Sequence, residues 1–503
     1  MRNSSCKIAL ALVSVVGLAS CADFLSGPGV SDTPNTATKL TLPGPLYVAL
    51  QAAQTTQFEG FLARLATMWT QQVAGVSRQH IGYDLYIITA NDVTAEWGQV
   101  YTGGGLTDVR RIQALAGALH DSTYIGVAKV WEALIMGEAA SMWGDIPYRE
   151  ALDPVKFPQP HADPQASVYA DVQAQLDSAI NIYLNATSTA TNIGPTGPIP
   201  GGTRNEELGY AGVSRSEIRR LYKQVAHTLK ARFYMHMAEL DGANYALALA
   251  QTVTGINVPA EDFLAFHSTA STEQNIWYQF QGVQRGDLGP GAAIINLMKS
   301  KNDQERLAFY FLTSADLGCT TADYFGNRPG ANKSVPGGLP AGECSDFNSM
   351  YTPDLRQPLV TFAENKLIAA EAAYQVSGGG AAGQAAAQPY LDAERTTPNY
   401  GTTSFAALPS IPATLQNIME EKYIALFLNI EVWNDFKRTC FPTLTPAPAT
   451  TSSTIPQAVI PGRLPYGQDE LNANKNLPQI SDRFARNHND PAACPIPSPL
   501  WAP

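Results

Sequence analysis

The sequence predicts a mostly α-helical protein built from pairs of helices. Apolar residues recur three or four positions apart over several long segments, which places them on one face of a helix. Alanines stand where two such helices would approach each other closely, and stretches rich in glycine and proline separate the periodic segments. With 503 residues, of which 45% are hydrophobic, the chain can bury a large core.

The N-terminus reads as an export signal. Arg2 and Lys7 come before or at the start of an apolar run over residues 8–19, which is too short to cross a membrane. We therefore expect residues 1–20 to be a signal peptide.

The signal ends in a motif for lipid attachment. Residues 18–21 read L-A-S-C and match the bacterial lipobox, in which a peptidase cuts before the cysteine and the cysteine thiol receives a lipid. We expect Cys21 to be lipidated and residues 21–40 to form a flexible tether, so that the protein is anchored to a membrane without spanning it. The alternative is an ordinary signal peptide with an incidental cysteine.

Charge and cysteine content narrow the function further. The net charge of −11 argues against nucleic acid as a partner. Four late cysteines in an exported chain suggest two disulfides, most simply Cys319–Cys344 and Cys440–Cys494, although four cysteines allow three pairings. No cysteine or histidine spacing indicates zinc, and we expect neither a metal nor a cofactor.

We expect the first helical segments and the central helix to form antiparallel hairpins. A helical region over residues 46–73 ends in an aromatic and amide cluster at Trp69. A polar loop over residues 77–92 follows, and a second helical region covers residues 94–119.

The central helix covers residues 124–143. Gly144 can supply its left-handed C-cap, and Pro147 cannot continue the helix, so a sharp corner follows Trp143. Glu138 lies on the apolar stripe, seven residues after Trp131. We therefore expect Glu138 to be a buried acid with a partner, because burial without one would be too costly.

The second half continues the same pattern. A glycine- and proline-rich surface loop is expected over residues 186–213. Helices are expected over these segments: 167–185, 216–240 with a short partner from residue 244, 360–374, 383–395, and 415–437. No strict repeat period is present, so periodicity by itself predicts only helix pairs.

Three segments carry a resemblance to a known family. The central helix runs into M-W-G-D-I-P-Y at residues 142–148, and P-Q-x-S-V-Y and L-D-S-A-I follow. Residues 420–439 and the P-x-R-x-x-Y-x-x-x-E pattern over residues 461–470 complete the match. These segments resemble the SusD/RagB family of outer-membrane nutrient-binding lipoproteins.

The resemblance implies a fold and a function. The fold would be a tetratricopeptide-like α-α superhelix over residues 41–503, with a loop-rich insertion at about 263–358 forming the ligand face. The protein would face outward from the bacterial outer membrane, capture a nutrient such as a glycan or oligosaccharide, and deliver it to a SusC-like TonB-dependent transporter. Two alternatives stay open, a surface glycosidase and a tetratricopeptide-like scaffold lipoprotein of an envelope complex.

The chemistry that the sequence carries is that of binding. No GxSxG, GxxxxGK[ST] or HExxH motif occurs, so we expect no enzyme activity. Aromatic side chains on loops can stack on sugar rings, with amides nearby to bind hydroxyls. The candidates are Trp69, Tyr83, Trp277, Tyr278 and Tyr324, although each of them by itself is more often a core residue.

Overall fold

The computed structural model describes residues 42–185, 194–198, 204–313, 315–316, 322–331, 346–348, 352–447 and 460–478. The described residues from Gly44 onward belong to one compact unit. The predicted signal peptide, Cys21 and the 21–40 tether lie outside the described residues. Among the helices of the described ranges, none combines the length and the apolar character that crossing a bilayer requires.

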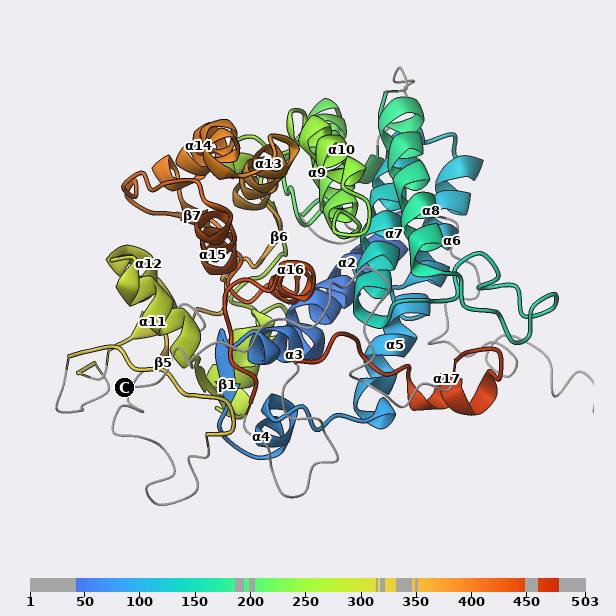
Figure 1. The fold of residues 1–503 in the computed structure, drawn as a ribbon. Helices are drawn as coiled ribbons and strands as arrows, with labels where there is room; N and C mark the ends of the chain where they lie inside the picture. The colour runs from blue at the N-terminus through green and yellow to red at the C-terminus, as the bar shows by residue number, and fades with distance from the viewer. Residues whose placement is uncertain are drawn as a thin grey trace, which may run out of the picture. The chain divides into compact units, whose positions relative to one another are not determined.

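Helices dominate the compact unit, which confirms the predicted mostly α fold (Figure 1). They pack in succession: α7 contacts α6 and α8, α9 contacts α8 and α10, α10 contacts α13, and α13 contacts α14 and α15. The bounds are α6 Leu106–Ala118, α7 Ser122–Trp143, α8 Gln165–Ser178, α9 Arg215–Met235, α10 Ala243–Thr252, α13 Phe362–Val376, α14 Gly380–Thr396 and α15 Leu415–Ala425. This succession of helix pairs is the tetratricopeptide-like α-α superhelix.

Four of these helices begin at a capping side chain. The N-cap residues Asp121, Ser214, Thr361 and Thr414 each accept a hydrogen bond from the backbone N–H three residues further on, at 3.0–3.3 Å. Such a cap satisfies one of the N–H groups that a helix start leaves unpaired, and is typically worth about 1 kcal/mol. The starts of α7, α9, α13 and α15 are therefore encoded locally.

The corner after α7 is a structural element, as the sequence predicted. Gly144 adopts φ +82°, which ends the helix. Trp143 is fully buried and its indole N–H donates to the carbonyl of Pro465 at 2.8 Å. Glu138 is also buried and lies 2.7 Å from the guanidinium of Arg232, so the expected buried, paired acid is confirmed.

Three helical regions that the sequence predicts as continuous are each broken into two helices. The breaks fall at Gly60, at the glycines of 103–105, and at Leu428, which adopts φ +63°. Gly60 leaves no room for a side chain, because a Cβ there would lie 2.3 Å from the carbonyl of Thr56. The resulting helices are α2 Gly44–Glu59, α3 Phe61–Trp69, α5 Thr94–Tyr101, α6, α15 and α16 Glu431–Thr439.

The break at Leu428 has a tertiary cause. The Gln72 side chain accepts a hydrogen bond from the Leu428 N–H at 2.8 Å and donates to the carbonyl of Tyr423 at 2.7 Å. Gln72 therefore satisfies backbone groups that a continuous helix would pair internally.

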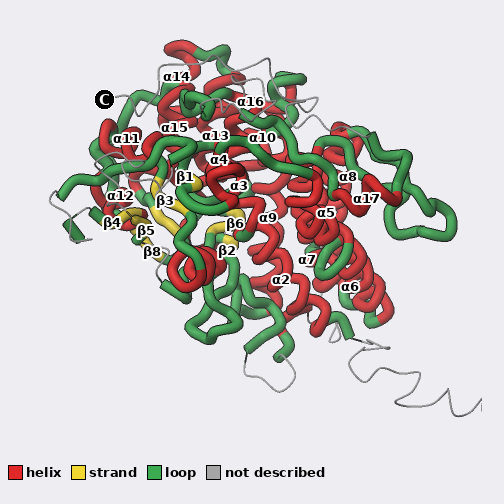
Figure 2. The backbone as a smooth tube through the Cα atoms, turned by 90° about the horizontal axis from the view of Figure 1, so that it is seen from below, coloured by secondary structure: helices red, strands yellow, loops and turns green. Residues whose placement is uncertain are grey.

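Short strands form small antiparallel pairs. In Figure 2, β4 and β5 lie near α12, whereas β2 and β6 lie near α9. The pairs are β1 Val73–Gly75 with β3 Leu288–Pro290, β2 Phe263–Leu264 with β6 Pro358–Val360, β4 Phe311–Leu312 with β5 Asp346–Phe347, and β7 Asn399–Tyr400 with β8 Thr403–Ser404. The predicted insertion also contains two short helices, α11 Ala292–Ser300 and α12 Gln304–Tyr310. Two further short helices are α4 Gln79–Asp84 and α17 Gln468–Ala473.

One of the predicted disulfide cysteines lies in the described part of the chain. Cys440, directly after α16, is disulfide-bonded. Cys319, Cys344 and Cys494 lie outside the described residues, so the pairing stays a prediction.

Candidate functional site

The loop after Trp69 and the 263–358 insertion lie against each other. Strand β1 pairs with β3 along three residues. Beyond the strands, the Arg78 guanidinium lies 2.6 Å from the carboxylate of Asp287. The Asp84 carboxylate accepts a hydrogen bond from the Gly330 N–H at 2.8 Å. These contacts bring together the two segments that the sequence predicts as the ligand face.

Aromatic rings gather where the two segments meet. The ring centroids of Phe61 and Tyr83 lie 5.1 Å apart, and those of His80 and Phe280 also lie 5.1 Å apart. The guanidinium carbon of Arg64 lies 4.2 Å from the centroid of the Phe280 ring. Phe61, Arg64, Tyr83 and Phe280 are half-buried. We call these four residues, with Tyr278 on the same π-helical turn η5 (Tyr278–Gln284) as Phe280, the aromatic surface.

Arg64 has unused hydrogen-bond donors. No carboxylate pairs with it and its side chain donates no hydrogen bond within the described ranges, and its Nε is buried. Burial lowers the pKa of Arg64 to about 10, so the guanidinium stays charged at neutral pH. The Nε is closed off from solvent, so the two terminal nitrogens of the guanidinium are the donors that a ligand oxygen could reach.

The two tyrosines of the aromatic surface differ in what they can offer. The Tyr83 hydroxyl donates to Asp92 at 2.9 Å, and burial together with this bond raises the pKa of Tyr83 to about 12. Tyr278 is half-buried, and its hydroxyl has no partner in the part of the chain that the structure describes. Asn275 holds the start of this turn by accepting hydrogen bonds from the N–H groups of Trp277 and Tyr278. Tyr278 therefore keeps both a ring and a hydroxyl for a ligand.

Two candidates from the sequence belong to the core. The side chains of Trp69 and Trp277 are 0% exposed, so the expectation that they stack on a ligand is wrong for this structure. The physical reason is that large aromatic side chains stabilise the core most when they are fully buried. Trp69 instead supports the aromatic surface, since its indole N–H donates to the carbonyl of Tyr83 at 2.9 Å. Tyr324 is half-buried against the core, and its role stays a prediction.

Sequence reasoning missed Phe61, Arg64, His80 and Phe280. A signal existed for Phe280, because it closes the aromatic run W-Y-Q-F at residues 277–280. Arg64 lies on α3 and has no local signal, since only the tertiary structure places it over the Phe280 ring.

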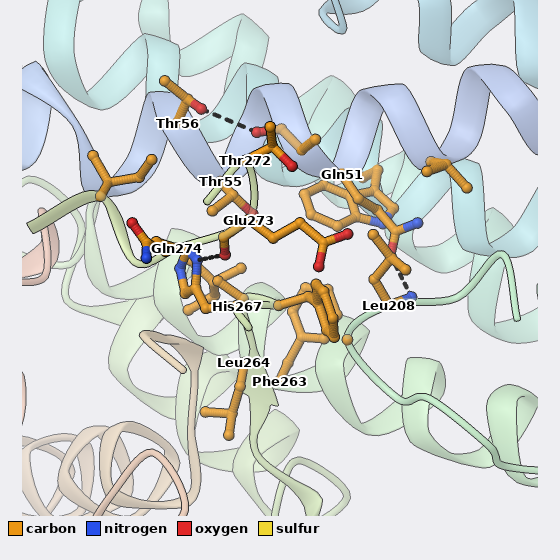
Figure 3. A pocket seen from close by; sticks show the side chains of 18 residues that line it. Gln51, Thr55, Thr56, Leu208, Phe263, Leu264, His267, Thr272, Glu273 and Gln274 are labelled. Atoms are coloured by element: carbon orange, nitrogen blue, oxygen red, sulfur yellow. Dashed lines mark hydrogen bonds between the residues drawn. The ribbon is translucent and has the colours of Figure 1, made fainter. Parts of the chain in front are cut away.

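A cavity of about 210 Å³ lies beside α2 (Figure 3). Gln51 and Thr55 on α2 form one wall, and Phe263, Leu264 and His267 lie across from them. The remaining lining residues are Val48, Ala52, Thr56, Trp131, Leu208, Gly209, Ala265, Phe266, Thr272, Glu273, Gln274, Ile276 and Leu359. Apolar rings and polar side chains thus face one small space.

Two ion pairs hold the cavity wall. Glu273 accepts hydrogen bonds from Arg204 at 2.8 Å and from Ser268 at 2.5 Å, and the bond from Arg204 is the main reason why the pKa of Glu273 is lowered. His267 Nε2 lies 2.8 Å from the carboxylate of Glu59, and both side chains are buried. Within the described ranges, no group of three or more histidine, cysteine or acidic side chains is placed to hold a metal ion.

The His267–Glu59 pair makes stability depend on pH. Burial acts to lower the pKa of His267, but the charge and hydrogen bond of Glu59 outweigh it, so the pKa is raised above 6.5. This stabilisation is complete below pH 6.5 and is lost as the pH rises through the raised pKa of the folded state. We expect the difference in unfolding midpoint between the natural protein and His267→Gln to shrink from pH 6 to pH 9. Thermal unfolding at both pH values measures it, and a difference that grows with pH would contradict the assignment.

Comparisons with known proteins agree with this fold. A SusD-like family model, described as "Starch-binding associating with outer membrane", matches residues 35–467. Among curated proteins, none matches the sequence significantly.

Solved structures share the architecture at low sequence identity. A protein described as chitin-binding has a TM-score of 0.69 at 20% identity, over 89% of this chain and 99% of that one. A SusD/RagB family protein from Bacteroides thetaiotaomicron has a TM-score of 0.65 at 18% identity, over 86% and 94%. A chitin-binding SusD homologue from Flavobacterium johnsoniae has a TM-score of 0.64 at 19% identity, over 91% and 98%. With a family model that matches most of its length and a superhelix of the same architecture, the chain belongs to the SusD/RagB family.

Proposed function

We propose that this protein is a lipid-anchored binding protein on the outer face of the outer membrane, which captures a glycan at the aromatic surface and delivers it to a TonB-dependent transporter. Membership of a family described as starch-binding and outer-membrane-associated supports carbohydrate as the ligand class. Two structural neighbours are described as chitin-binding, which makes chitin oligosaccharides the second class to test. The observation that carries the proposal is the unpaired Arg64 guanidinium among half-buried aromatic rings.

The aromatic surface has the chemistry that sugar recognition needs. A sugar ring has an apolar face of C–H groups, which packs on aromatic rings, and an edge of hydroxyls, which needs donors and acceptors. Tyr278 and Phe280 offer rings, and Arg64 offers donors that no described residue uses. This combination favours a neutral oligosaccharide over an apolar ligand.

Asp92, the carboxylate that contacts Tyr83 of the aromatic surface, is committed to a structural role. Glycoside hydrolysis needs two carboxyl groups about 5–10 Å apart across the scissile bond. Asp92 already accepts hydrogen bonds from Tyr83 and from the backbone N–H and hydroxyl of Thr89, where it completes a capping box. An acid bound in this way is a structural element, so we infer that the protein is not an enzyme.

Replacing residues of the aromatic surface should weaken glycan capture without unfolding the protein. We expect Tyr278→Ala and Arg64→Met each to cost about 1–2 kcal/mol of binding free energy, which is about 5- to 30-fold in Kd. Arg64→Met keeps an apolar stem over the Phe280 ring and removes only the charge and donors. Calorimetry with chitin and starch oligosaccharides measures both variants.

The matched control is Tyr390→Ala, which removes a half-buried tyrosine from α14. It should leave the Kd unchanged. Equal loss in all three variants would point to general destabilisation, and no loss in the first two would remove the aromatic surface from consideration. Turnover of an oligosaccharide by the purified protein would instead support the glycosidase alternative.

Anchoring rests on Cys21, which the lipobox singles out. Cys21→Ala should move the protein from the outer-membrane fraction to a soluble fraction, because the covalent lipid supplies the membrane affinity. Fractionation followed by immunoblotting checks this. A variant that still sediments with the outer membrane would rule out lipidation as the anchor.

The transporter partner can be tested separately. We expect a gene for a TonB-dependent receptor next to the gene of this protein, and co-purification of the two proteins from solubilised outer membranes. Co-purification with other envelope proteins instead would support the scaffold alternative.

A further inference from the structure

The cavity beside α2 is a second place where aromatic rings and hydrogen-bonding side chains lie close together. Segment 272–276, which forms part of its wall, leads directly into η5 of the aromatic surface. Phe263, Leu264 and Leu208 give the cavity a buried apolar wall, while Ala52, Thr56 and Thr272 at its edge are exposed. The cavity therefore opens to solvent and continues from the segment that carries Tyr278 and Phe280.

Several polar groups that face the cavity have no partner among the residues that the structure describes. The side chains of Thr55, Thr272 and Gln274 make no hydrogen bond to any described residue. Gln51 is different, since its amide donates to the carbonyl of Glu206 at 2.7 Å and accepts from the Leu208 N–H at 2.9 Å. Gln51 thus holds the wall rigid. Thr55, Thr272 and Gln274 are available to bind a ligand.

Size and charge limit what the guest can be. Pockets for drug-sized ligands have volumes of about 300–1,000 Å³, so a cavity of about 210 Å³ suits one ring and not a chain of them. Glu273 is held ionised by Arg204 and would repel an acidic guest. A purely apolar guest would leave the hydroxyls and amide unpaired, which is unfavourable.

We propose that this cavity is a separate subsite that binds one neutral sugar ring, the end of a glycan whose other residues lie on the aromatic surface. The subsite rests on the proposed glycan-binding function and adds to it a preference for chain ends. The apolar face of the ring packs against Phe263 and Phe266, and its hydroxyls reach Thr55, Thr272, Gln274 and the Glu273 carboxylate.

Saturation-transfer NMR on the full chain tests the subsite with single rings. The neutral probes are the methyl glycosides of glucose, N-acetylglucosamine, galactose and mannose, and the charged probe is methyl β-glucuronide. We expect a signal from at least one neutral probe and none from the glucuronide. Ala52→Phe places a ring at the cavity mouth and should weaken binding of the neutral probe at least tenfold. Thr55→Val keeps the cavity shape but removes a hydroxyl, so it should weaken binding of the neutral probe several-fold.

The control is Ala49→Phe, which places the same ring on the exposed side of α2 outside the cavity lining. It should leave the signal unchanged. Unfolding midpoints of all variants confirm that they fold. A signal that survives Ala52→Phe, or stronger binding of the glucuronide, would overturn the subsite.

The same variants separate this inference from the proposed function. One outcome is that oligosaccharides bind and Arg64→Met weakens their binding, but Ala52→Phe changes the signal of no single sugar ring. The subsite is then wrong and the proposed function stands. If single rings respond to Ala52→Phe but Arg64→Met leaves oligosaccharide binding intact, the subsite stands and the aromatic surface is not the main site.

Discussion

Arg232→Met should lower the free energy of unfolding by about 3–5 kcal/mol, because it leaves buried carboxylates without their cation. Arg232 on α9 is buried, and its guanidinium nitrogens lie 2.7 Å from the Glu138 carboxylate and 2.6 Å from the Glu364 carboxylate. Its Nη2 also donates to the carbonyl of Leu359 at 2.8 Å. A third acid, Glu431, lies 3.9 Å away. Denaturant unfolding measures the loss.

The charges around Arg232 explain why the loss should be large. The charges of Glu364, Glu431 and Glu138 raise the pKa of Arg232 although burial opposes this, so the guanidinium is the centre of the cluster. Burial, and then the neighbouring Glu431, raises the pKa of Glu138. Without Arg232, the remaining acids would repel one another in a region that water does not reach. Adding Glu364→Gln to Arg232→Met should therefore recover part of the loss.

Arg220→Met is the matched control on the same helix. Arg220 pairs with Glu217 and Glu261 at 2.5 Å each, but its side chain is 44% exposed. Pairs of this kind contribute at most about 1 kcal/mol. Equal destabilisation by Arg220→Met and Arg232→Met would show that burial does not set the cost.

Trp143→Ala should also destabilise the fold by about 3–5 kcal/mol, the usual cost of truncating a buried tryptophan. Trp143 is 1% exposed, and its ring centroid lies 5.4 Å from that of Trp97. Its indole N–H donates a hydrogen bond to the carbonyl of Pro465. The substitution removes this contact between the end of α7 and the C-terminal segment. Trp143→Phe should cost less, because it keeps a ring and loses mainly the hydrogen bond.

Glycan affinity measured below the unfolding midpoint distinguishes a scaffold role from a binding role for Trp143. We expect the Kd of Trp143→Ala to match that of the natural protein. An unchanged midpoint together with lost binding would place Trp143 in the site.

The candidate site could be predicted only in part. The sequence singled out the loop after Trp69, the insertion and Tyr278, because loops with aromatic residues do not have the periodicity of core helices. It could not separate Tyr278 from Trp277, its buried neighbour, because neighbouring positions on a helical turn point in different directions and only the packing of the turn decides which of them is buried. Arg64 could not be found at all, since its importance comes from its position over Phe280, more than two hundred residues later.

The sequence by itself determined the helical class, the pairing of neighbouring helices, the corner after α7 and the burial of Glu138. These features depend on local spacing, on capping side chains and on the cost of burying a charge, all of which can be judged from nearby residues. Only the tertiary structure decided where the long helices break, which acids Arg232 joins, and that the aromatic surface and the cavity exist. Each of these depends on contacts between residues far apart in the chain, such as Gln72 with Leu428, and no local pattern records such contacts.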